Sequence, residues 1–412
     1  MRLGYLVPEF PSQTHIFFWR EVQALRRLGD EVFILSTRKP PSDACKHDFA
    51  KEAVAATHYL FPPGVVGLTG WLLGGLTGAG QAFAYLRQLD APLQDRLRQL
   101  AYLVCAIDLV QWARKNRIDH IHGHSCADSA HILALSKRMG GPSFSLTLHG
   151  DLDVYGRDHR AKFAEAAFVS AVGKHLCDQI IERTGLPECK VLPTFMGIET
   201  SRLAALGLER ASQAGALRLV TIARLHPNKG HFHALAAVRR ARDEGLNITY
   251  TIAGEGMFRE AIVTKIGELG LRDSVKLTGT VSENEVFQLL SDADAFLLTS
   301  VGKGEAWPVS VMEAMGAGLP VISSIIGATP EMIRPGVDGF LVPQRDEDAI
   351  FEKIMILARN VQERQQIGAA ARMTSQNRFD VSASAGVLRE SICAQRKAAA
   401  CSIAESGGRG RP

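Results

Sequence analysis

The stretch LRLVTIARLHPNKGHFHALAAVRRARDEGLNITYTIAGEG, residues 217–256, changes its apolar pattern twice. Residues 217–225 form an apolar run typical of a buried strand. Residues 231–245 place apolar side chains at helical spacing, and residues 247–256 return to a strand-like composition. A strand, a helix and a strand in this order predict a βαβ unit with parallel strands. The stretch therefore favours an α/β fold with helices on both faces of its sheet.

The same alternation extends along the chain in both directions. Further strands are expected at 275–281, 295–300, 319–325 and 339–343, and in the N-terminal half at 2–8, 31–37, 120–125, 143–150, 167–173 and 190–195. The polar segment 198–216, rich in small residues, is the expected linker between the two halves. We therefore expect two doubly wound, Rossmann-like domains with parallel sheets, which bind ligands at the carboxyl ends of the strands in the cleft between them.

These patterns give expected domain boundaries. The N-terminal domain is expected at 1–198, the C-terminal domain at 199–379, a C-terminal helix at 380–400, and a disordered tail at 401–412. The tail is predicted from its ending SGGRGRP, which is rich in glycine and arginine and has no apolar period.

The composition is that of a soluble globular protein. The chain has 412 residues, 46% hydrophobic and 22% charged, with a formal net charge of +4. So small a charge permits contact with an anionic membrane surface or a phosphate-bearing substrate and does not indicate nucleic-acid binding. The seven cysteines are scattered without a C-x-x-C pair, and the N-terminus lacks the apolar core of a secretory signal. We therefore expect reduced thiols and a cytoplasmic location, with any membrane contact at the inner face of the cytoplasmic membrane.

One apolar segment bears on membrane contact. Residues 65–86, VVGLTGWLLGGLTGAGQAFAYL, contain no charge and are long enough to span a bilayer. Six glycines and two threonines dilute their hydrophobicity, and the flanks show no clear Lys/Arg asymmetry. We expect helices packed within a domain, while a peripheral membrane patch and a true span stay open as alternatives.

Two basic residues follow the first strand of the C-terminal half. In ARLHPNKG, 223–230, Arg224 and Lys229 leave the strand's carboxyl end just before a helix begins. Arginine offers a planar fork to phosphate oxygens and lysine a mobile point charge, and a helix N-terminus adds backbone donors. The pattern suggests a phosphate site, although two solvated surface cations would give the same letters.

Two acidic residues stand eight positions apart in GKGEAWPVSVMEAMGAGLP, 302–320. Glu305 lies in a glycine-rich loop, Pro308 suits the first helical position, and Glu313 lies about two turns into the following helix. A carboxylate accepts hydrogen bonds from two adjacent hydroxyls, as a sugar or ribose diol offers. Between the two carboxylates, the glycine-rich backbone and the first N–H groups of the helix could donate hydrogen bonds to phosphate oxygens. The alternative is a surface acid and a partner of the helix dipole.

Taken together, these motifs resemble the family 4 retaining glycosyltransferases of the two-domain GT-B type. The R-L-x-x-x-K-G run is followed about 80 residues later by E-x₇-E and A-M-x-A-G-L-P-V, and then by GATPEMIRPGVDGFLVP, 327–343. The resemblance covers most of the chain. It implies that the N-terminal domain binds the acceptor, that the C-terminal domain binds the nucleotide sugar, and that the helix at 380–400 crosses back to the N-terminal domain. It also implies a transferase that uses a nucleotide-sugar donor, UDP- or GDP-linked, as a co-substrate and needs no further cofactor.

The resemblance also implies roles for individual residues. Arg224 and Lys229 would bind the donor diphosphate, Glu313 the ribose, and Glu305 the transferred sugar. Three residues after Glu305 would complete the donor site, and these are Ala306, Trp307 and Pro308. Trp307 stands where a smaller residue is commoner, so its indole is expected to reshape the sugar pocket. In TLHGDLD, 147–153, His149 matches the family's cleft histidine, which lies close to the anomeric centre of the donor sugar.

The first loop is similar to that of a polysaccharide branch of this family, of the colanic-acid type. Within PEFPSQTHIFFWREVQALRRLGDEV, 8–32, the expected acceptor contacts are Phe10, Ser12, Thr14 and His15. Thr14 and His15 stand where this branch usually has Ser and Glu. The Gly-Gly of many other members is absent from this loop, which removes the basis for a backbone contact with phosphate here.

HIHGHSCADSAH, 120–131, has a composition that could form a metal site. The candidate ligands are His122, His124, Cys126, Asp128 and His131. The family has a counterpart, a strand ending in H-x-H, that holds no metal. The two D-x-D triplets, at 151–153 and 292–294, could suggest a metal-dependent transferase. Since two cations and a helix N-terminus can neutralise a leaving diphosphate, we expect no metal.

The main hypothesis is a retaining hexosyltransferase that moves a sugar from a nucleotide diphosphate to a hydroxyl of a glycan or lipid-linked saccharide. Such transfers assemble exopolysaccharide, lipopolysaccharide and related glycoconjugates. The alternatives are a sugar-nucleotide epimerase on the same fold, a non-catalytic glycan-binding scaffold and, more remotely, a metal hydrolase built on His122, His124 and Cys126. The sequence leaves open the base, the sugar, the acceptor, the linkage and the oligomeric state.

Overall fold

The computed structural model describes residues 1–62, 78–90, 96–206 and 214–407, with side chains up to residue 398. The chain forms two compact units. Unit 1 comprises Met1–Cys45, Phe49–Phe195 and Ser382–Pro412, and unit 2 comprises Lys46–Asp48 and Met196–Val381. From the sequence, the corresponding domain boundaries were expected after residues 198 and 379.

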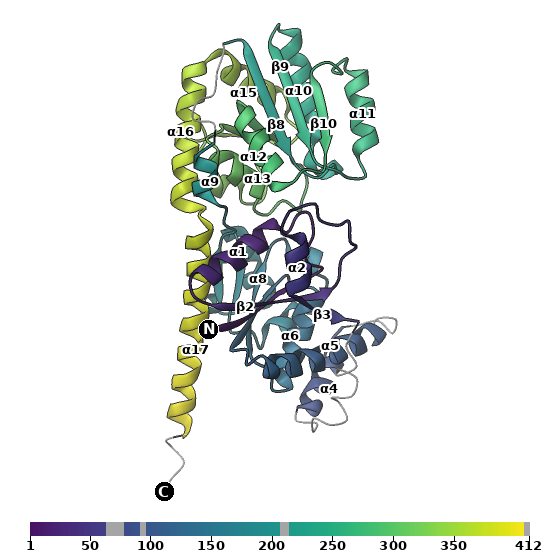
Figure 1. Ribbon diagram of the computed structural model, residues 1–412, viewed down its shortest axis with the longest axis vertical. Helices are drawn as coiled ribbons and strands as arrows, with labels where there is room; N and C mark the ends of the chain where they lie inside the picture. The colour runs from purple at the N-terminus through teal and green to yellow at the C-terminus, as the bar shows by residue number, and fades with distance from the viewer. Residues whose placement is uncertain (63–77, 91–95, 207–213, 408–412) are drawn as a thin grey trace. The chain divides into compact units, whose positions relative to one another are not determined.

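Unit 1 is built on a parallel sheet of seven strands in the order β3-β2-β1-β4-β5-β6-β7. Figure 1 labels β2 and β3 of this sheet and several helices of the unit. The strands are β1 (Arg2–Val7), β2 (Glu31–Arg38), β3 (Thr57–Phe61), β4 (His120–His124), β5 (Ser143–Leu148), β6 (Val169–Val172) and β7 (Val191–Thr194). In register, Tyr5 of β1 lies opposite His122 of β4, and His124 lies opposite Thr147 of β5. The strand order reverses at β1 and β4, as in a doubly wound sheet.

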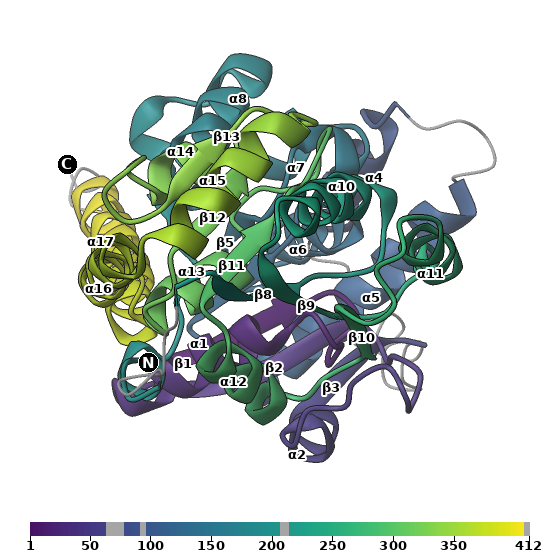
Figure 2. The same cartoon turned by 90° about the horizontal axis from the view of Figure 1, so that it is seen from above.

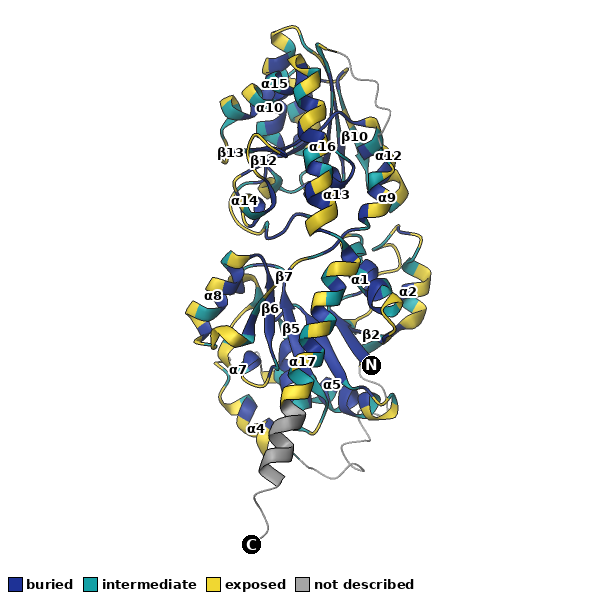
Figure 3. Cartoon of the chain, turned by 90° about the vertical axis from the view of Figure 1, so that its left-hand side faces the viewer, coloured by how far each residue is buried: buried dark blue, intermediate teal, exposed yellow. Residues whose placement is uncertain are grey.

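The helices of unit 1 connect these strands. They are α1 (Ile16–Arg27), α2 (Ala50–Ala56), α4 (Ala79–Arg87), α5 (Arg96–Lys115), α6 (Asp128–Arg138), α7 (His159–Phe163), α8 (Lys174–Thr184) and α17 (Val381–Gly407), with 3-10 turns η2 (Leu152–Tyr155) and η3 (Glu188–Lys190). α1 buries Phe18, Val22 and Leu25, which recur every three to four residues and so share one face. In Figure 3 the strands of both sheets are mainly dark blue, whereas the exposed residues lie mostly on helices and loops.

Unit 2 is built on a parallel sheet of six strands in the order β10-β9-β8-β11-β12-β13. The strands are β8 (Ala216–Ile222), β9 (Asn247–Ala253), β10 (Val275–Gly279), β11 (Ala295–Leu298), β12 (Val321–Ser324) and β13 (Phe340–Val342). The helices are α9 (Thr200–Ala204), α10 (His231–Asp243), α11 (Arg259–Glu268), α12 (Glu283–Asp292), α13 (Val309–Gly316), α14 (Thr329–Met332), α15 (Glu347–Arg359) and α16 (Val361–Arg378), with a 3-10 turn η4 (Pro227–Lys229). The two parallel, doubly wound sheets confirm the predicted fold class.

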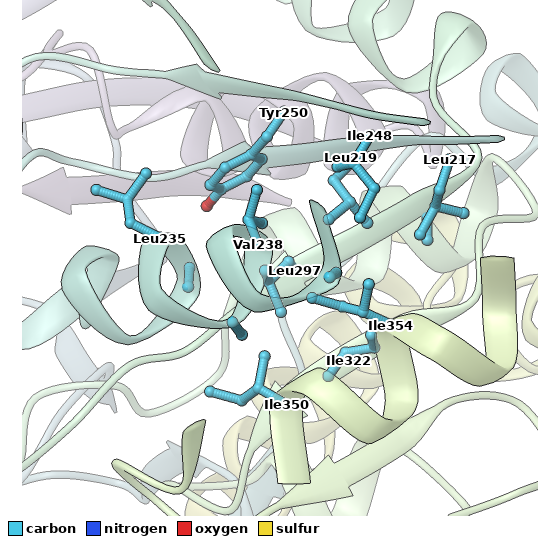
Figure 4. Packing of buried hydrophobic residues seen from close by; sticks show 14 of the residues in the cluster. Leu217, Leu219, Leu235, Val238, Ile248, Tyr250, Leu297, Ile322, Ile350 and Ile354 are labelled. Atoms are coloured by element: carbon cyan, nitrogen blue, oxygen red, sulfur yellow. The ribbon is translucent and has the colours of Figure 1, made fainter. Parts of the chain in front are cut away.

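The core of unit 2 shows why the stretch 217–256 decides the fold. Leu217 and Leu219 are two residues apart on β8, so they point to the same face of the sheet. On that face they meet Val238 of α10 and Ile354 of α15 (Figure 4). α10 and α15 lie side by side over the strands (Figure 2). Each of these four side chains is at most 2% exposed, and burial of this extent stabilises the fold by about 1.5–3 kcal/mol per side chain.

Two expectations need correction, one at the start of unit 2 and one at the C-terminal end of the chain. The expected linker, 198–216, contains helix α9, which packs on α13 and α16 and buries Leu203, while residues 207–213 lie outside the described residues. The expected disordered tail from 401 is helical as far as Gly407, where α17 ends, and residues 408–412 lie outside the described residues. The run AQRKAAACSIAES consists largely of good helix formers, so the helix continues until the glycines.

Helix α17 belongs to unit 1, although the chain reaches it from unit 2. Its inward face buries Ala385, Leu388 and Ile392. Arg389 Nε donates to Asp30 Oδ2 at 2.9 Å, and the Asp30 side chain is fully buried. The expected C-terminal helix at 380–400 therefore corresponds to an element of the first unit.

The apolar segment 65–86 is described only in part. Residues 63–77 lie outside the described residues, and helix α4 buries Ala82 and Tyr85 against unit 1. Among the described residues, no helix has the length and apolar character that crossing a bilayer requires.

Close backbone contacts fix the loops at the carboxyl edge of the unit 2 sheet. Gly230 has a φ of +65°, and a Cβ there would lie 1.8 Å from the Thr299 carbonyl oxygen. Gly327 has a φ of +52°, and its Cβ would lie 1.8 Å from the Glu305 carbonyl oxygen. Only glycine permits these approaches, which bring the loops after β8 and β12 against the loop after β11.

We expect Gly230→Ala to destabilise unit 2 far more than Gly302→Ala. Both glycines have positive φ, but a Cβ at Gly302 would meet no atom within 4 Å. Gly302→Ala should therefore lower the free energy of unfolding by only the left-handed backbone cost of about 1–2 kcal/mol. Gly230→Ala adds a backbone clash, for a total of about 3 kcal/mol or more. Urea unfolding measures both, and equal losses would contradict the close approach.

Candidate functional site

The candidate donor-binding residues gather at one edge of unit 2. The loop after β8 and the loop after β11 start from strands that pair directly, and β12 pairs with β11 on its other side. Backbone bonds tie the loops together, because Val301 N donates to Asn228 O at 2.7 Å and Ala328 N donates to Ala306 O at 2.9 Å. Residues about 75 and 100 positions apart in sequence therefore share one edge, as the sequence analysis expected.

Lys229 and Glu305 form an ion pair at this edge. The same carboxylate oxygen of Glu305 accepts a hydrogen bond from Ser300 Oγ at 2.8 Å. The side chains of Lys229 and Glu305 are only 16% and 11% exposed, so water screens the pair weakly. From the sequence, these residues were expected to contact separate parts of the donor. In the structure they neutralise each other.

Arg224 differs from Lys229 in its surroundings. It is exposed, and its guanidinium has no hydrogen bond or ion pair within the described part of the chain. Its backbone is nevertheless held, since the Arg224 carbonyl accepts from His226 N at 3.0 Å. The positive charge of Arg224 is therefore not neutralised by any described side chain, while its backbone is held in place.

Glu313 lies on the helix that follows the glycine-rich loop, as expected, but it is the fifth residue of α13 and so little more than one turn from its start, not two. It is 6% exposed. Pro308, expected at the first helical position, is instead the N-cap, with an extended backbone of φ −69° and ψ 110°, and Val309 is the first helical residue. The loop glycines 302 and 304 both have positive φ.

Trp307 does not line a pocket as the sequence analysis expected. Its side chain is 3% exposed, its indole N–H donates to Met312 Sδ at 3.0 Å, and its ring meets Phe379 edge-on at 6.0 Å between centroids. The indole therefore faces the core of unit 2 and supports α13. Ala306 is also buried and contributes its carbonyl to the loop contact with Ala328.

In unit 1, buried histidines alternate with hydroxyls between β4 and β5. His120 contacts Ser143 Oγ and Ser145 Oγ, both at 2.8 Å. His122 contacts Ser145 Oγ at 2.7 Å and Thr147 Oγ1 at 2.9 Å. Both ring nitrogens of each histidine are thus occupied by hydroxyl partners. Burial lowers the pKa of His120 to about 3 and the pKa of His122 well below its usual value.

These contacts give the proposed metal ligands other roles. Asp128 accepts from Arg98 and Tyr102, and His131 Nδ1 contacts the Tyr85 hydroxyl at 2.7 Å. Among the described residues, no three His, Cys, Asp or Glu side chains form a metal-binding group. Each D-x-D triplet also has an aspartate in an ion pair with an arginine. Asp153 pairs with Arg183, and Asp294 pairs with Arg218.

The histidine row ends in a cluster at the carboxyl edge of the sheet. His124 Nδ1 lies 2.9 Å from His149 Nε2, and His124 Nε2 lies 3.3 Å from Glu21 Oε2. The Tyr5 hydroxyl donates to the same oxygen of Glu21. His149 is thus placed where its strand ends, as expected, but it is joined to α1 through His124.

Burial controls the charges of this cluster. It lowers the pKa of His124 to about 3 and the pKa of His149 well below its usual value, and for His149 the neighbouring His124 adds to the effect. Burial also raises the pKa of Glu21, against the hydrogen bond from Tyr5. Both imidazoles are therefore neutral at pH 7, so each has one N–H and one lone pair.

The loop expected to contact the acceptor is only partly accessible. Phe10 is fully buried and packs on Phe49, so its side chain anchors the loop to the core of unit 1. It cannot form the acceptor contact that was expected of it. Thr14 is exposed and Ser12 is half-buried. His15 stacks on Phe10, and burial lowers its pKa to about 4.

Two residues of these clusters, Glu21 and Ser300, were not among the site residues expected from the sequence. Glu21 lies three residues after Phe18 and four before Leu25, so an acidic side chain interrupts the apolar face of α1. A carboxylate in such a place needs a buried partner, and this signal was available in the sequence. Ser300 is the second residue after β11, and only the folded loop brings it to Glu305.

Comparison with known proteins agrees with the fold and the motifs. Residues 210–374 match the family described as glycosyl transferases, group 1. The chain is 33% identical over 380 residues to the putative colanic acid biosynthesis glycosyltransferase WcaL of Escherichia coli K12, covering 86% of this chain and 90% of that protein. It is 32% identical over 402 residues to the amylovoran biosynthesis glycosyltransferase AmsK of Erwinia amylovora, covering 92% and 96%.

Solved structures show the same fold at low identity. Anabaena Alr3699/HepE in complex with UDP superposes with a TM-score of 0.71 at 16% identity, over 96% of this chain and all of that one. The lipopolysaccharide outer core galactosyltransferase WaaB superposes with a TM-score of 0.69 at 17% identity, over 95% and 99%. With relatives above 30% identity over most of its length, the chain belongs to the family 4, or group 1, glycosyltransferases of GT-B architecture.

Proposed function

We propose that the protein is a retaining, metal-independent hexosyltransferase. It takes a sugar from a UDP- or GDP-linked donor and passes it to a hydroxyl of a glycan or lipid-linked saccharide. The observation that carries the proposal is the group formed by Lys229, Glu305 and Ser300 beside the uncommitted Arg224. One edge of a sheet then offers two cations for a diphosphate and a carboxylate for sugar hydroxyls.

The proposed donor contacts follow from chemistry and position. Arg224 and Lys229 bind the diphosphate and stabilise the negative charge that builds on it as it leaves. Glu313 accepts from the ribose hydroxyls, and Glu305 accepts from hydroxyls of the transferred sugar. The backbone N–H groups after Pro308 add donors for phosphate oxygens. Because the cations and these donors supply the positive charge, the mechanism requires no metal ion.

In the proposed reaction, the bond between the anomeric carbon and the diphosphate oxygen breaks first, and its electron pair goes to the phosphate. The acceptor hydroxyl then bonds to the anomeric carbon from the same face, and its proton passes to the leaving phosphate. The donor's configuration is thereby retained. His149 lies near the transferred sugar and contacts one of its hydroxyls.

The acceptor is proposed from the relatives. WcaL and AmsK are named for colanic acid and amylovoran biosynthesis, and WaaB for the outer core of lipopolysaccharide. We propose a growing saccharide of this kind, carried on a lipid at the inner face of the cytoplasmic membrane, with Ser12, Thr14 and His15 on the acceptor side. The relatives are named as transferases, which favours transfer over the epimerase and scaffold alternatives.

Arg224→Ala should weaken nucleotide binding without affecting stability. Since the Arg224 side chain has no partner within the described residues, its removal leaves no group unpaired. Loss of a charge-assisted hydrogen bond costs about 1.5–3 kcal/mol, so the Kd for the preferred nucleotide should rise about ten- to a hundredfold. Isothermal titration with UDP, GDP, ADP and CMP measures this and identifies the base.

Arg272→Ala is the matched control. Arg272 carries the same charge and is exposed on the turn before β10. It therefore lies at the amino ends of the strands of unit 2, at the opposite side of the sheet from the loops that follow β8 and β11. Its removal should leave nucleotide affinity unchanged. If none of the four nucleotides bound the unmodified protein, the proposed donor site would be refuted.

Glu305→Gln should separate nucleotide binding from sugar transfer. Glu305 is paired with Lys229 in the structure, so its carboxylate competes with the diphosphate for the same cation. The variant should bind UDP or GDP as tightly as the unmodified protein or more tightly. Its kcat should fall by about 10² or more, because an electrostatic contact to the reacting sugar is lost.

Titration with the free nucleotide and a turnover assay with the sugar nucleotide measure the two effects. Glu268→Gln serves as control, since Glu268 pairs with Lys265 on the surface of α11. Weaker nucleotide binding in Glu305→Gln, with transfer unchanged, would reverse the roles assigned to Glu305 and Lys229.

A further inference from the structure

A continuous row of polar side chains leads from α1 to His149. The Tyr5 hydroxyl and His124 Nε2 both face Glu21 Oε2, the latter at 3.3 Å, and His124 Nδ1 lies 2.9 Å from His149 Nε2. The row ends at His149 Nδ1, a covered atom that has no hydrogen-bond partner among the described residues. Tyr5 is fully buried and the His124 side chain is 3% exposed, so water does not interrupt the row.

Two arrangements of protons are compatible with the short contact between the imidazoles. In the first, His124 has its proton on Nε2, His149 donates from Nε2 to His124 Nδ1, and His149 Nδ1 is a lone pair. In the second, His124 donates from Nδ1 to His149 Nε2, and His149 carries its proton on Nδ1. The two arrangements differ in whether His149 offers an acceptor or a donor at its free nitrogen.

Glu21 distinguishes between them. The second arrangement would place a lone pair of His124 against an oxygen of Glu21, whereas the first places an N–H there. Oε2 accepts from Tyr5, and it stays an acceptor whether the carboxyl is ionised or carries a proton on Oε1. The approach of His124 Nε2 is oblique, so the preference comes from electrostatic attraction at 3.3 Å and not from a well-aligned hydrogen bond.

The second arrangement is disfavoured at the other end of the row too. It would leave a buried N–H on His149 Nδ1 without an acceptor among the described residues, whereas the first leaves only a lone pair. An unpaired buried donor is the rarer situation in folded proteins. Both ends of the row thus favour the same arrangement.

We propose that Glu21 is a positioning residue that acts through His124 to fix the tautomer of His149, with the proton on Nε2 and a lone pair on Nδ1. His149 then accepts a hydrogen bond from a hydroxyl that reaches Nδ1 and donates none there. The identity of that hydroxyl, on the transferred sugar, rests on the proposed function. The tautomer itself does not.

The tautomer can be measured without substrate. In protein labelled with ¹⁵N at the histidine rings, long-range ¹H–¹⁵N spectra at neutral pH distinguish a protonated from an unprotonated nitrogen, and His124→Phe and His149→Phe proteins assign the two rings. We expect Nε2 protonated and Nδ1 unprotonated in both. A proton on Nδ1 of His149 in the unmodified protein would overturn the proposal by itself, without any variant of Glu21.

Glu21→Leu tests the cause. It removes the oxygen that faces His124, so the His149 signals should change to the reversed tautomer or to a mixture of the two. Tyr5→Phe is the matched control, because it also removes a hydrogen bond of Glu21 but keeps the carboxylate beside His124, and its tautomers should be unchanged. A folded Glu21→Leu protein with unaltered His149 signals would also overturn the proposal.

Activity provides a separate readout. Glu21→Leu should lower kcat for transfer about tenfold, while the Kd for the free nucleotide, whose proposed contacts are all in unit 2, stays the same. An equal loss in Tyr5→Phe would point to general destabilisation and contradict a positioning role. If no sugar nucleotide supported transfer, the proposed function would fail, whereas the tautomer measurement would still decide the role of Glu21.

Discussion

Parallel pairing of strands is the constraint on which the rest of this structure depends. When neighbouring strands run the same way, all loops that follow them emerge at one edge of the sheet. In unit 1 this edge collects His124 and His149 from β4 and β5. In unit 2 it collects Lys229 and Glu305 from the loops after β8 and β11. Side chains that are distant in sequence are thus brought together at the strand ends of each sheet, without long loops.

The same pairing creates the buried polar row of unit 1. Alternate residues of β4 are histidines and alternate residues of β5 are hydroxyls, so each His120 or His122 nitrogen finds a partner on the adjacent strand. Burying such groups unpaired would cost several kcal/mol, and a satisfied network is rigid. Glu21 extends the network to α1 and connects a helix on the face of the sheet to a histidine at its edge.

The two units hold their functional side chains in different ways. Unit 1 fixes its histidines in neutral form by burial and hydrogen bonds, which suits recognition of hydroxyl groups. Unit 2 keeps Arg224 exposed and Lys229 neutralised by Glu305, which suits an anionic ligand that replaces the carboxylate. Glycines at 230 and 327 make this possible, because any larger residue would separate the loops that carry the charges.

The sequence alone determined the fold class, the family motifs and the residues at the strand ends, because apolar periodicity and motif spacing are local properties of the chain. The direction in which a side chain points was decided by the tertiary structure. Trp307 lies within the motif but packs on Phe379, and Phe10 lies in the loop but packs on Phe49. Part of the run that looked like a linker forms α9 (Thr200–Ala204), which packs on α13 and α16. Glu21 contacts His124, which is far away in sequence, so only packing could show which partner its carboxylate has. Ser300 reaches Glu305, five residues further on, only through the folded loop after β11.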